Sequence, residues 1–139
     1  MCIRDRDRVL VNEIAPRVHN SGHLTIEHAT TSQFENHVRA VAGLPLGDTT
    51  PRVAHATMLN AIGDRPDDSE LDRLGVVRVG ESGDADGDGD AFWHDYRKSP
   101  RPGRKVGHLT VAADQVDPRR IDALAAVVPG AVLSEAPAD

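Results

Sequence analysis

The chain has 139 residues, a formal net charge of −6 at neutral pH, 3% aromatic residues and one cysteine. Negative net charge argues against a general nucleic-acid-binding protein, because such proteins cluster positive charge against phosphates. The sequence contains no run of about 18 apolar residues, so no membrane-spanning helix is predicted. One cysteine excludes an internal disulfide framework, and these features together favour a cytoplasmic protein.

The first six residues, MCIRDR, have no hydrophobic pattern and include the cysteine, Cys2. They match what a common sequencing-library adapter encodes when it is read as protein. We therefore interpret residues 1–6 as an adapter scar and leave them out of the predicted fold. This interpretation implies that the natural chain extends further upstream, whereas the alternative is a genuine charged start.

Residues 9–23, VLVNEIAPRVHNSGH, begin as a predicted strand and turn polar at Asn12 and Glu13. If this segment is extended, Glu13, Arg17 and His19 point to one side. Glu13 and Arg17 then lie roughly 13 Å apart, at about 3.3 Å per residue. This separation excludes a salt bridge and leaves room for a charged ligand, with a metal at the carboxylate and an oxyanion at the guanidinium. The alternative is a polar strand end that faces water.

Residues 24–29 are predicted to form a short strand or turn, and residues 33–42 a helix. Ser32 and Glu35 have the spacing of a capping box at the start of this helix. Its apolar side chains recur at three- and four-residue steps, at Phe34, Val38 and Val41. A turn-rich stretch at residues 47–52 then marks a predicted domain boundary.

Short strands dominate the prediction for the second half of the chain. We expect strands at residues 53–62, 76–79, 92–96, 106–111 and 131–133, a helical turn at 70–74 and a helix that begins at Pro118. Residues 80–90 form an acidic, glycine-rich loop whose aspartates match several positions of a calcium-binding loop. The last position of that pattern is Asp95 instead of glutamate, so we favour a solvated insertion over a calcium site.

Two blocks of sequence carry a resemblance to a known family. They are NEIAPRVHNSGH with the following TSQFENHVRAVAGLPLG, and RPGRKVGHLTV at residues 101–111. They resemble, in the same order, the carboxy-terminal part of the 5-(carboxyamino)imidazole ribonucleotide synthase family, ATP-grasp enzymes of purine biosynthesis. The resemblance implies an α+β fold. Residues 7–50 would end an ATP-grasp domain with a strand and a helix, and residues 51–139 would form a small β-rich domain closed by a helix.

The same resemblance implies the ATP-dependent carboxylation of aminoimidazole ribonucleotide with bicarbonate. The reaction passes through carboxyphosphate and gives the carboxyamino product, ADP and phosphate. ATP and Mg²⁺ are the implied cofactors, small molecules are the implied partners, and a homodimer is expected for the full-length protein. The family also has upstream domains that are missing here, so we expect the 139-residue chain to be inactive alone.

Family resemblance also assigns roles to individual residues. Asn12 and Glu13 would contact ATP, and Glu13 would hold magnesium. Arg17 and His19 would hold bicarbonate or carboxyphosphate, and Lys105 would reach the substrate ribonucleotide. Such roles suit the residue types, because a guanidinium binds an oxyanion through two parallel hydrogen bonds and a histidine moves protons near neutral pH.

Asn20, Ser21 and Arg104 are weaker candidates for binding the substrate. Asn20 and Ser21 form a polar turn that lets the backbone approach a ligand, and the alternative is a plain turn. Arg104 and Lys105 lie in a glycine-flanked turn that suits an anion, and the alternative is two solvated charges on a hairpin. We treat four further histidines as structural or surface groups: His23, His28, His37 and His55.

Two other functions remain open. The first is a different ATP-grasp ligase or carboxylase, against which the HNSGH and RPGRKVGH blocks argue. The second is a non-enzymatic module that keeps an anion-binding loop without chemistry.

Overall fold

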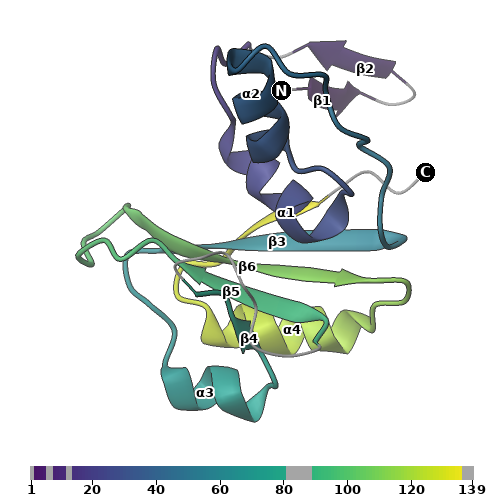
Figure 1. Ribbon diagram of the computed structural model, residues 1–139. Coiled ribbons are helices and arrows are strands. Elements are labelled where there is room, and N and C mark those ends of the chain that lie inside the picture. Colours follow the sequence, from purple (N-terminus) through teal and green to yellow (C-terminus); the bar gives the residue numbers. More distant parts are fainter. Residues whose placement is uncertain (1, 6–7, 12–13, 81–88, 136–139) are drawn as a thin grey trace.

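The computed structural model describes residues 2–5, 8–11, 14–80 and 89–135, and it confirms the predicted α+β fold (Figure 1). A short hairpin of β1 (Cys2–Asp5) and β2 (Arg8–Val11) comes first, followed by three helices. These are the 3-10 helix η1 (Asn20–Leu24), α1 (Thr25–His28) and α2 (Gln33–Val41). The hairpin was not predicted, because residues 1–6 were left out of the expected fold.

A five-stranded sheet follows, in the order β4-β5-β6-β3-β7. Its strands are β3 (His55–Ile62), β4 (Val77–Arg78), β5 (Ala91–Asp95), β6 (Lys105–Ala113) and β7 (Val132–Glu135). β4 and β5 are parallel, and the other neighbours are antiparallel. Helices α3 (Asp68–Arg73) and α4 (Pro118–Val127) lie on one side of the sheet, and α1 and α2 lie on the other (Figure 1).

Helix ends follow the predicted capping chemistry. The Ser32 side chain accepts a hydrogen bond from the backbone N–H of Glu35 at 3.1 Å, and Gly43 ends this helix with φ of 68°. Asp117 caps α4 in the same way, by accepting from the N–H of Arg119 at 2.9 Å. Both helices therefore begin where the sequence predicts.

Residues 24–29 were predicted to form a short strand or turn, and the strand alternative was wrong, because Thr25–His28 continue the helical turns of η1 as α1. The hydroxyl of Thr25 donates to the carbonyl of Gly22 at 2.6 Å and accepts from the N–H of Gln33 at 2.8 Å. Thr25 thus ties the helical turns to the start of α2. A strand-like pattern of small and β-branched residues gave no sign of these contacts.

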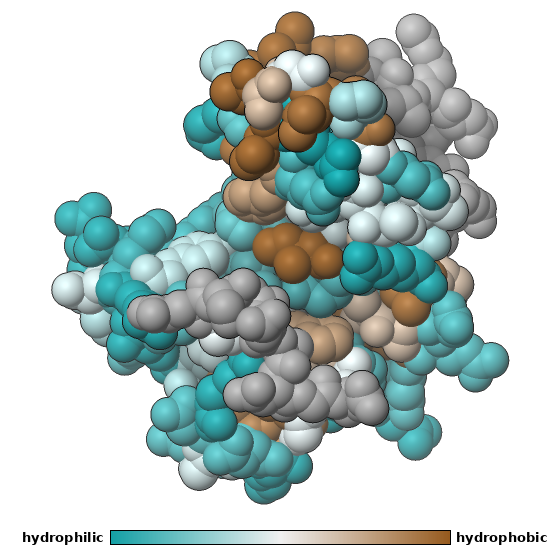
Figure 2. Space-filling view, in the orientation of Figure 1, coloured by the Kyte–Doolittle hydropathy of each residue, from teal (hydrophilic) through white to brown (hydrophobic). Residues whose placement is uncertain are grey.

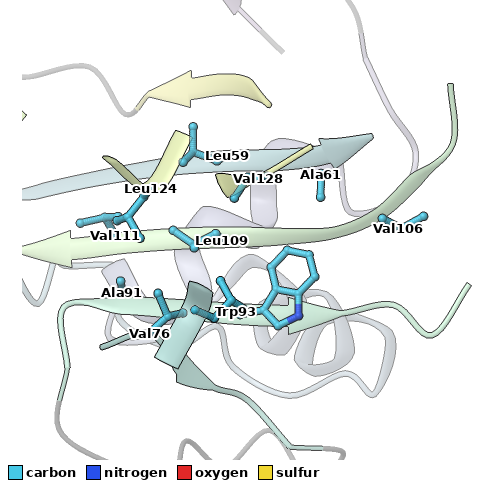
Figure 3. Close-up of a cluster of buried hydrophobic side chains, with 11 residues drawn as sticks. Leu59, Ala61, Val76, Ala91, Trp93, Val106, Leu109, Val111, Leu124 and Val128 are labelled. Carbon is cyan, nitrogen blue, oxygen red and sulfur yellow. The ribbon is translucent and has the colours of Figure 1, made fainter. Parts of the chain in front are cut away.

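The sheet has an apolar face that forms the main core against α3 and α4 (Figure 3). Leu59, Leu109, Trp93 and Leu124 are among its buried side chains. Because side chains alternate along a strand, their neighbours point to the opposite face. That face carries buried polar residues, namely Asn60, His108 and Thr110.

Apolar side chains also gather on the surface over α2 and the segment after it (Figure 2). They are Val38, Val41, Leu44 and Leu46, with exposed fractions of 64%, 78%, 55% and 68%. In a single domain such side chains would normally turn inward. Among the described residues, no helix has the length and apolar character needed to cross a membrane.

Candidate functional site

A row of polar side chains crosses three strands on the polar face of the sheet. His108 of β6 is paired with Asn60 of β3 on one side and with His94 of β5 on the other. The rings of His94 and His108 are stacked, with centroids 4.3 Å apart and planes inclined by 9°. The sheet register therefore places an amide and two imidazoles side by side.

The helical turns of η1 and α1 dock onto this row with matching spacing. Asn20, His23 and Glu27 are separated by three and four residues, so they share one face of a helical stretch. Each one contacts a different member of the row. We call these six residues the polar seam: Asn20, His23, Glu27, Asn60, His94 and His108.

The two ends of the polar seam are hydrogen-bonded pairs. The Asn20 side-chain amide donates to Asn60 Oδ1 at 3.0 Å. His94 Nε2 lies 2.6 Å from Glu27 Oε1, and the two side chains are only 14% and 9% exposed. The first contact joins the HNSGH segment to the sheet, and the second joins α1 to the sheet.

His23 is the middle member of the seam. Its ring centroid lies 4.7 Å from that of His108, and it also packs against Phe34 at 4.8 Å and Tyr96 at 5.4 Å. The Tyr96 hydroxyl is 2.8 Å from Nδ1 of His108. His23 is thus held between aromatic rings from both halves of the chain.

A cavity of about 480 Å³ opens beside Asn20 and His23 of the polar seam. It is lined by Arg17, Val18, Asn20, His23, Phe34, Tyr96, Lys98 and Lys105. Three of these side chains are cationic and three carry aromatic rings. This combination suits a ligand that has both an anionic group and a flat ring.

Burial controls the protonation of the groups around this cavity. Burial lowers the pKa of His23, and the nearby His94 and Lys105 add to this, while its bond to the Asn20 carbonyl and the charge of Glu27 oppose it. Burial also lowers the pKa of His108 to about 2, helped by His94 and His23. The pKa of Tyr96 is raised by burial to about 12. At neutral pH His23, His108 and Tyr96 are therefore uncharged.

Two glycines lie in closely packed positions, Gly22 within the amino-terminal segment and Gly107 within the sheet. A Cβ on Gly22 would lie 2.1 Å from Gln33 Oε1, and one on Gly107 would lie 2.4 Å from the Trp93 ring and 2.5 Å from the His94 carbonyl. Gly107 has no room for a side chain, because the Trp93 ring and the His94 backbone are in the way, whereas at Gly22 the closest atom is the end of the flexible Gln33 side chain. These glycines belong to the HNSGH and RPGRKVGH blocks, so both blocks are shaped for close packing.

The structure brings some of the predicted site residues together. Arg17, Asn20 and Lys105 line the same cavity, although Arg17 and Lys105 are far apart in sequence. Arg17 Nη1 also donates to the Val18 carbonyl at 2.9 Å. Residues from both sequence blocks therefore line one pocket. The roles of these residues stay predictions.

Other predicted residues lie elsewhere or outside the described residues. His19 and Ser21 contact each other through His19 Nδ1 and Ser21 Oγ, 3.0 Å apart, at the start of η1 and do not line this cavity. Arg104 Nη1 lies 3.4 Å from the Ser99 carbonyl, also away from the cavity lining. Asn12 and Glu13 lie outside the described residues.

The predicted acidic loop lies largely outside the described residues, which resume at Gly89. Asp90 pairs with Arg120 at 2.8 Å, and Asp95 pairs with Arg65 at 3.2 Å. Within the described ranges, no group of three or more His, Cys, Asp or Glu side chains could hold a metal ion.

Sequence reasoning missed several residues around the cavity. His23 was treated as a structural or surface group, yet it lines the cavity, and Tyr96 does so as well. His108, Thr110 and their apolar neighbours alternate along the strand, which could have indicated a buried polar face. The spacing of Asn20, His23 and Glu27 was a second signal, which the prediction of a short strand or turn at residues 24–29 did not use.

Comparisons with known proteins agree with this architecture. Residues 2–34 match the family model of the ATP-grasp domain. Residues 56–120 match that of the phosphoribosylaminoimidazole carboxylase C-terminal domain. The chain is 53% identical over 100 residues to the N5-carboxyaminoimidazole ribonucleotide synthase of Pseudomonas aeruginosa, covering 72% of this chain and 24% of that protein. The corresponding Vibrio cholerae protein is 47% identical over 107 residues, covering 77% and 24%.

Solved structures show the same likeness. The N5-carboxyaminoimidazole ribonucleotide synthetase of Thermus thermophilus matches with a TM-score of 0.74 at 44% identity, covering 91% of this chain and 32% of that one. The Aspergillus clavatus synthase, solved with ADP and 5-aminoimidazole ribonucleotide, matches with a TM-score of 0.60 at 33% identity, covering 85% and 31%. The chain thus spans about a quarter of the length of the curated relatives it matches, 24% in both cases given.

Proposed function

The chain belongs to the N5-carboxyaminoimidazole ribonucleotide synthase family, and we propose that it supplies one wall of that enzyme's active site. The reaction is the ATP-dependent carboxylation of 5-aminoimidazole ribonucleotide with bicarbonate, through carboxyphosphate, in purine biosynthesis. The products are the carboxyamino ribonucleotide, ADP and phosphate. Residues 7–50 would end the ATP-grasp domain, and residues 51–139 would form the small carboxy-terminal domain.

One observation carries this proposal, namely the cavity that both sequence blocks line. Arg17 comes from the amino-terminal block and Lys105 from the second block, and both face the same space of about 480 Å³. A ribonucleotide has a phosphate for such cations and an imidazole ring for the aromatic side chains. Carboxyphosphate is a compact anion that needs positive charge placed in advance.

The roles of the side chains follow from their chemistry. Arg17 would hold the oxygens of bicarbonate or carboxyphosphate, and Lys105 would face the ribonucleotide and the same anion. His19, at the cap of η1, would assist in holding carboxyphosphate or in moving a proton. Carbon dioxide released from carboxyphosphate would then meet the substrate amine, with Asn20, Ser21 and Arg104 as further contacts to the substrate.

ATP and magnesium would reach this segment through Asn12 and Glu13, which lie outside the described residues. Within the described residues, no group of three or more His, Cys, Asp or Glu side chains is placed to hold a metal ion. When bound, magnesium supplies positive charge that neutralises the transferring phosphate.

The exposed apolar face of α2 supports a place within a larger protein. Val38 and Val41 are 64% and 78% exposed, and we propose that the rest of the ATP-grasp domain packs there. The full-length protein would act in the cytoplasm on small molecules, as a homodimer. We expect the 139-residue chain alone to lack synthase activity, so measurable turnover by the purified chain would overturn this view.

A chimaera tests the proposal directly. In the Pseudomonas aeruginosa synthase, the matching segment would be replaced by residues 14–139 of this chain. Formation of the carboxyamino product would be measured with ATP, bicarbonate and aminoimidazole ribonucleotide. We expect turnover, and a decrease of about 100-fold in Arg17→Ala and in Lys105→Ala, which is typical for lost transition-state charge stabilisation.

The exposed Arg101, in the turn before Lys105, provides a matched control, because it does not line the cavity. Arg101→Ala should keep nearly full activity. Turnover of a different acceptor in place of aminoimidazole ribonucleotide would indicate another ATP-grasp ligase. Anion binding by a folded chimaera without any turnover would indicate a binding module.

A further inference from the structure

We propose that His23 is a catalytic residue that accepts the proton released by the substrate amine during carboxylation. This inference rests on the proposed function and names a residue for one step of that reaction. It depends on the hydrogen bonds of the ring, on its place in the cavity and on the charges around it.

The hydrogen bond at Nδ1 fixes the tautomer of the ring. His23 Nδ1 lies 2.8 Å from the backbone carbonyl of Asn20. A carbonyl oxygen can only accept, so Nδ1 carries a proton in this contact. In the neutral ring Nε2 is then the nitrogen with a free lone pair, and it is the atom that can accept a proton.

Packing fixes the position of the ring. Phe34, Tyr96 and His108 contact it from α2, from the segment after β5 and from β6, at centroid distances of 4.8, 5.4 and 4.7 Å. A ring that is clamped by three others keeps its orientation without help from a ligand. A base with a fixed orientation is what a proton transfer in a transition state requires.

The surroundings keep the ring neutral. Burial is the main cause that lowers its pKa, and the neighbouring His94 and Lys105 lower it further, while the bond to the Asn20 carbonyl and the charge of Glu27 raise it. Several charged and titratable side chains contact the ring, act on its pKa or line the same cavity. They are Arg17, Glu27, His94, Tyr96, Lys98, Lys105 and His108. Cations outnumber carboxylates in this set, so the neutral imidazole is favoured at the pH of the reaction.

The other residues that line the cavity are unsuited to accept a proton. An arginine guanidinium and a lysine ammonium have no lone pair to offer. Tyr96 stays protonated, because burial raises its pKa to about 12. Among the described residues that line this cavity, His23 is thus the side chain suited to be a base at neutral pH.

The carboxylation step needs such a base. The amine nitrogen forms a bond to the carbon of carbon dioxide, and one C–O π pair moves onto oxygen to give the carboxylate. The nitrogen would then carry a positive charge beside Arg17, Lys98 and Lys105 unless an N–H proton leaves. Transfer of that proton to Nε2 of His23 gives the neutral carbamate nitrogen and an imidazolium.

The chimaera described above tests this step with His23→Gln. Glutamine keeps a side-chain N–H donor but cannot accept the proton, so we expect carboxylation to slow by about 100-fold while the affinity for the ribonucleotide changes little. His55→Gln at the exposed start of β3 is the matched control and should keep full activity. The unsubstituted chimaera should lose activity as pH falls through the lowered pKa of His23, and the variant should lose that dependence.

The outcomes separate the two proposals. If the unsubstituted chimaera forms no product, the proposed function fails. If it forms product and folded His23→Gln is as active as His55→Gln, the role of His23 fails. If the His23→Gln variant does not fold, nitrogen-15 NMR of the unsubstituted chimaera tests the role of His23 instead. A neutral His23 with its proton on Nδ1 at neutral pH supports the proposal, and a charged ring or a proton on Nε2 overturns it.

Discussion

The two faces of the five-stranded sheet are built from the same strands and behave differently. On one face Leu59 and Leu109 pack against helices in a dry apolar core. On the other, their strand neighbours Asn60 and His108 form part of the polar seam. Apolar contacts do not depend on direction, whereas hydrogen bonds and stacked rings require a defined relative orientation of the two side chains. The apolar face therefore stabilises the domain, and the polar face sets how the HNSGH segment sits on it.

The polar face carries a cost in stability that the apolar face does not. Glu27 Oε2, His108 Nε2 and Thr110 Oγ1 are buried without a hydrogen-bond partner among the described residues. Each such atom costs about 1–3 kcal/mol of stability. A row of aliphatic side chains would avoid that cost, so the polar residues fit a functional role better than a packing role.

The largest expected effect comes from breaking the apolar face. Leu109 is fully buried in the main core. Leu109→Ala should lower the free energy of unfolding by about 3 kcal/mol, because it removes buried methyl groups and leaves a cavity. The loss should be nearly the same at every pH at which the protein stays folded. Denaturant unfolding measures it, and a loss below about 1 kcal/mol would contradict the assignment of this face as the core.

The polar face should make stability depend on pH. His108 titrates near pH 2 in the folded chain, while an unfolded histidine titrates near 6.5. Between these values the unfolded state binds more protons, so stability falls as pH falls. From pH 6.5 to 5 the loss should be about 1.6 kcal/mol for His108, and the lowered pKa of His23 acts in the same direction.

Unfolding curves of His108→Gln and His55→Gln at a series of pH values test this prediction. The His108 variant should lose most of the slope, and the variant at the exposed His55 should keep it. Equal slopes in both variants would show that the buried imidazole is not the source.

A smaller effect is expected at the end of the seam. Asn60 is 1% exposed, and its Oδ1 accepts from the Asn20 side chain at 3.0 Å. Asn60→Ala should cost about 1 kcal/mol, the usual net value of one hydrogen bond. A double-mutant cycle with Asn20→Ala should give a coupling energy of similar size. Strictly additive losses would mean that the two amides do not interact.

The smallest effect should lie outside both faces. Arg39 and Glu35 form an ion pair at 2.7 Å on exposed helix α2, with side chains 37% and 50% exposed. Arg39→Gln should change the free energy of unfolding by no more than about 0.5 kcal/mol. Thermal unfolding in low and high salt checks this, and a loss comparable to that of Asn60→Ala would be against it.

The sequence predicts the regular elements and the apolar face well, for physical reasons. The helix cap at Ser32 and the proline at the start of the last helix, Pro118, are local signals. Such signals depend on neighbouring residues alone, so they can be recognised in the sequence. The strand that contains Leu109 was predicted from its run of apolar and β-branched residues. Elements stabilised by contacts within a few residues could thus be located without the structure.

The seam and the cavity depend on contacts between distant residues. Glu27 and His94 are 67 positions apart, and Asn20 and Asn60 are 40 apart. The helical form of residues 24–28 depends on hydrogen bonds of Thr25 that no periodicity reveals. His23 was consequently assigned no role from the sequence. Spacing and residue type marked Arg17 and Lys105 as candidate anion-binding groups, and the resemblance to a known family gave them their expected roles.

A crystal structure of the chimaera with ADP and aminoimidazole ribonucleotide tests the proposed site most directly. We predict that the ribonucleotide occupies the cavity lined by Arg17, Asn20, His23 and Lys105, with its amine within hydrogen-bond distance of His23 Nε2. A ribonucleotide bound elsewhere, with only solvent in this cavity, would contradict the assignment of the cavity to the active site.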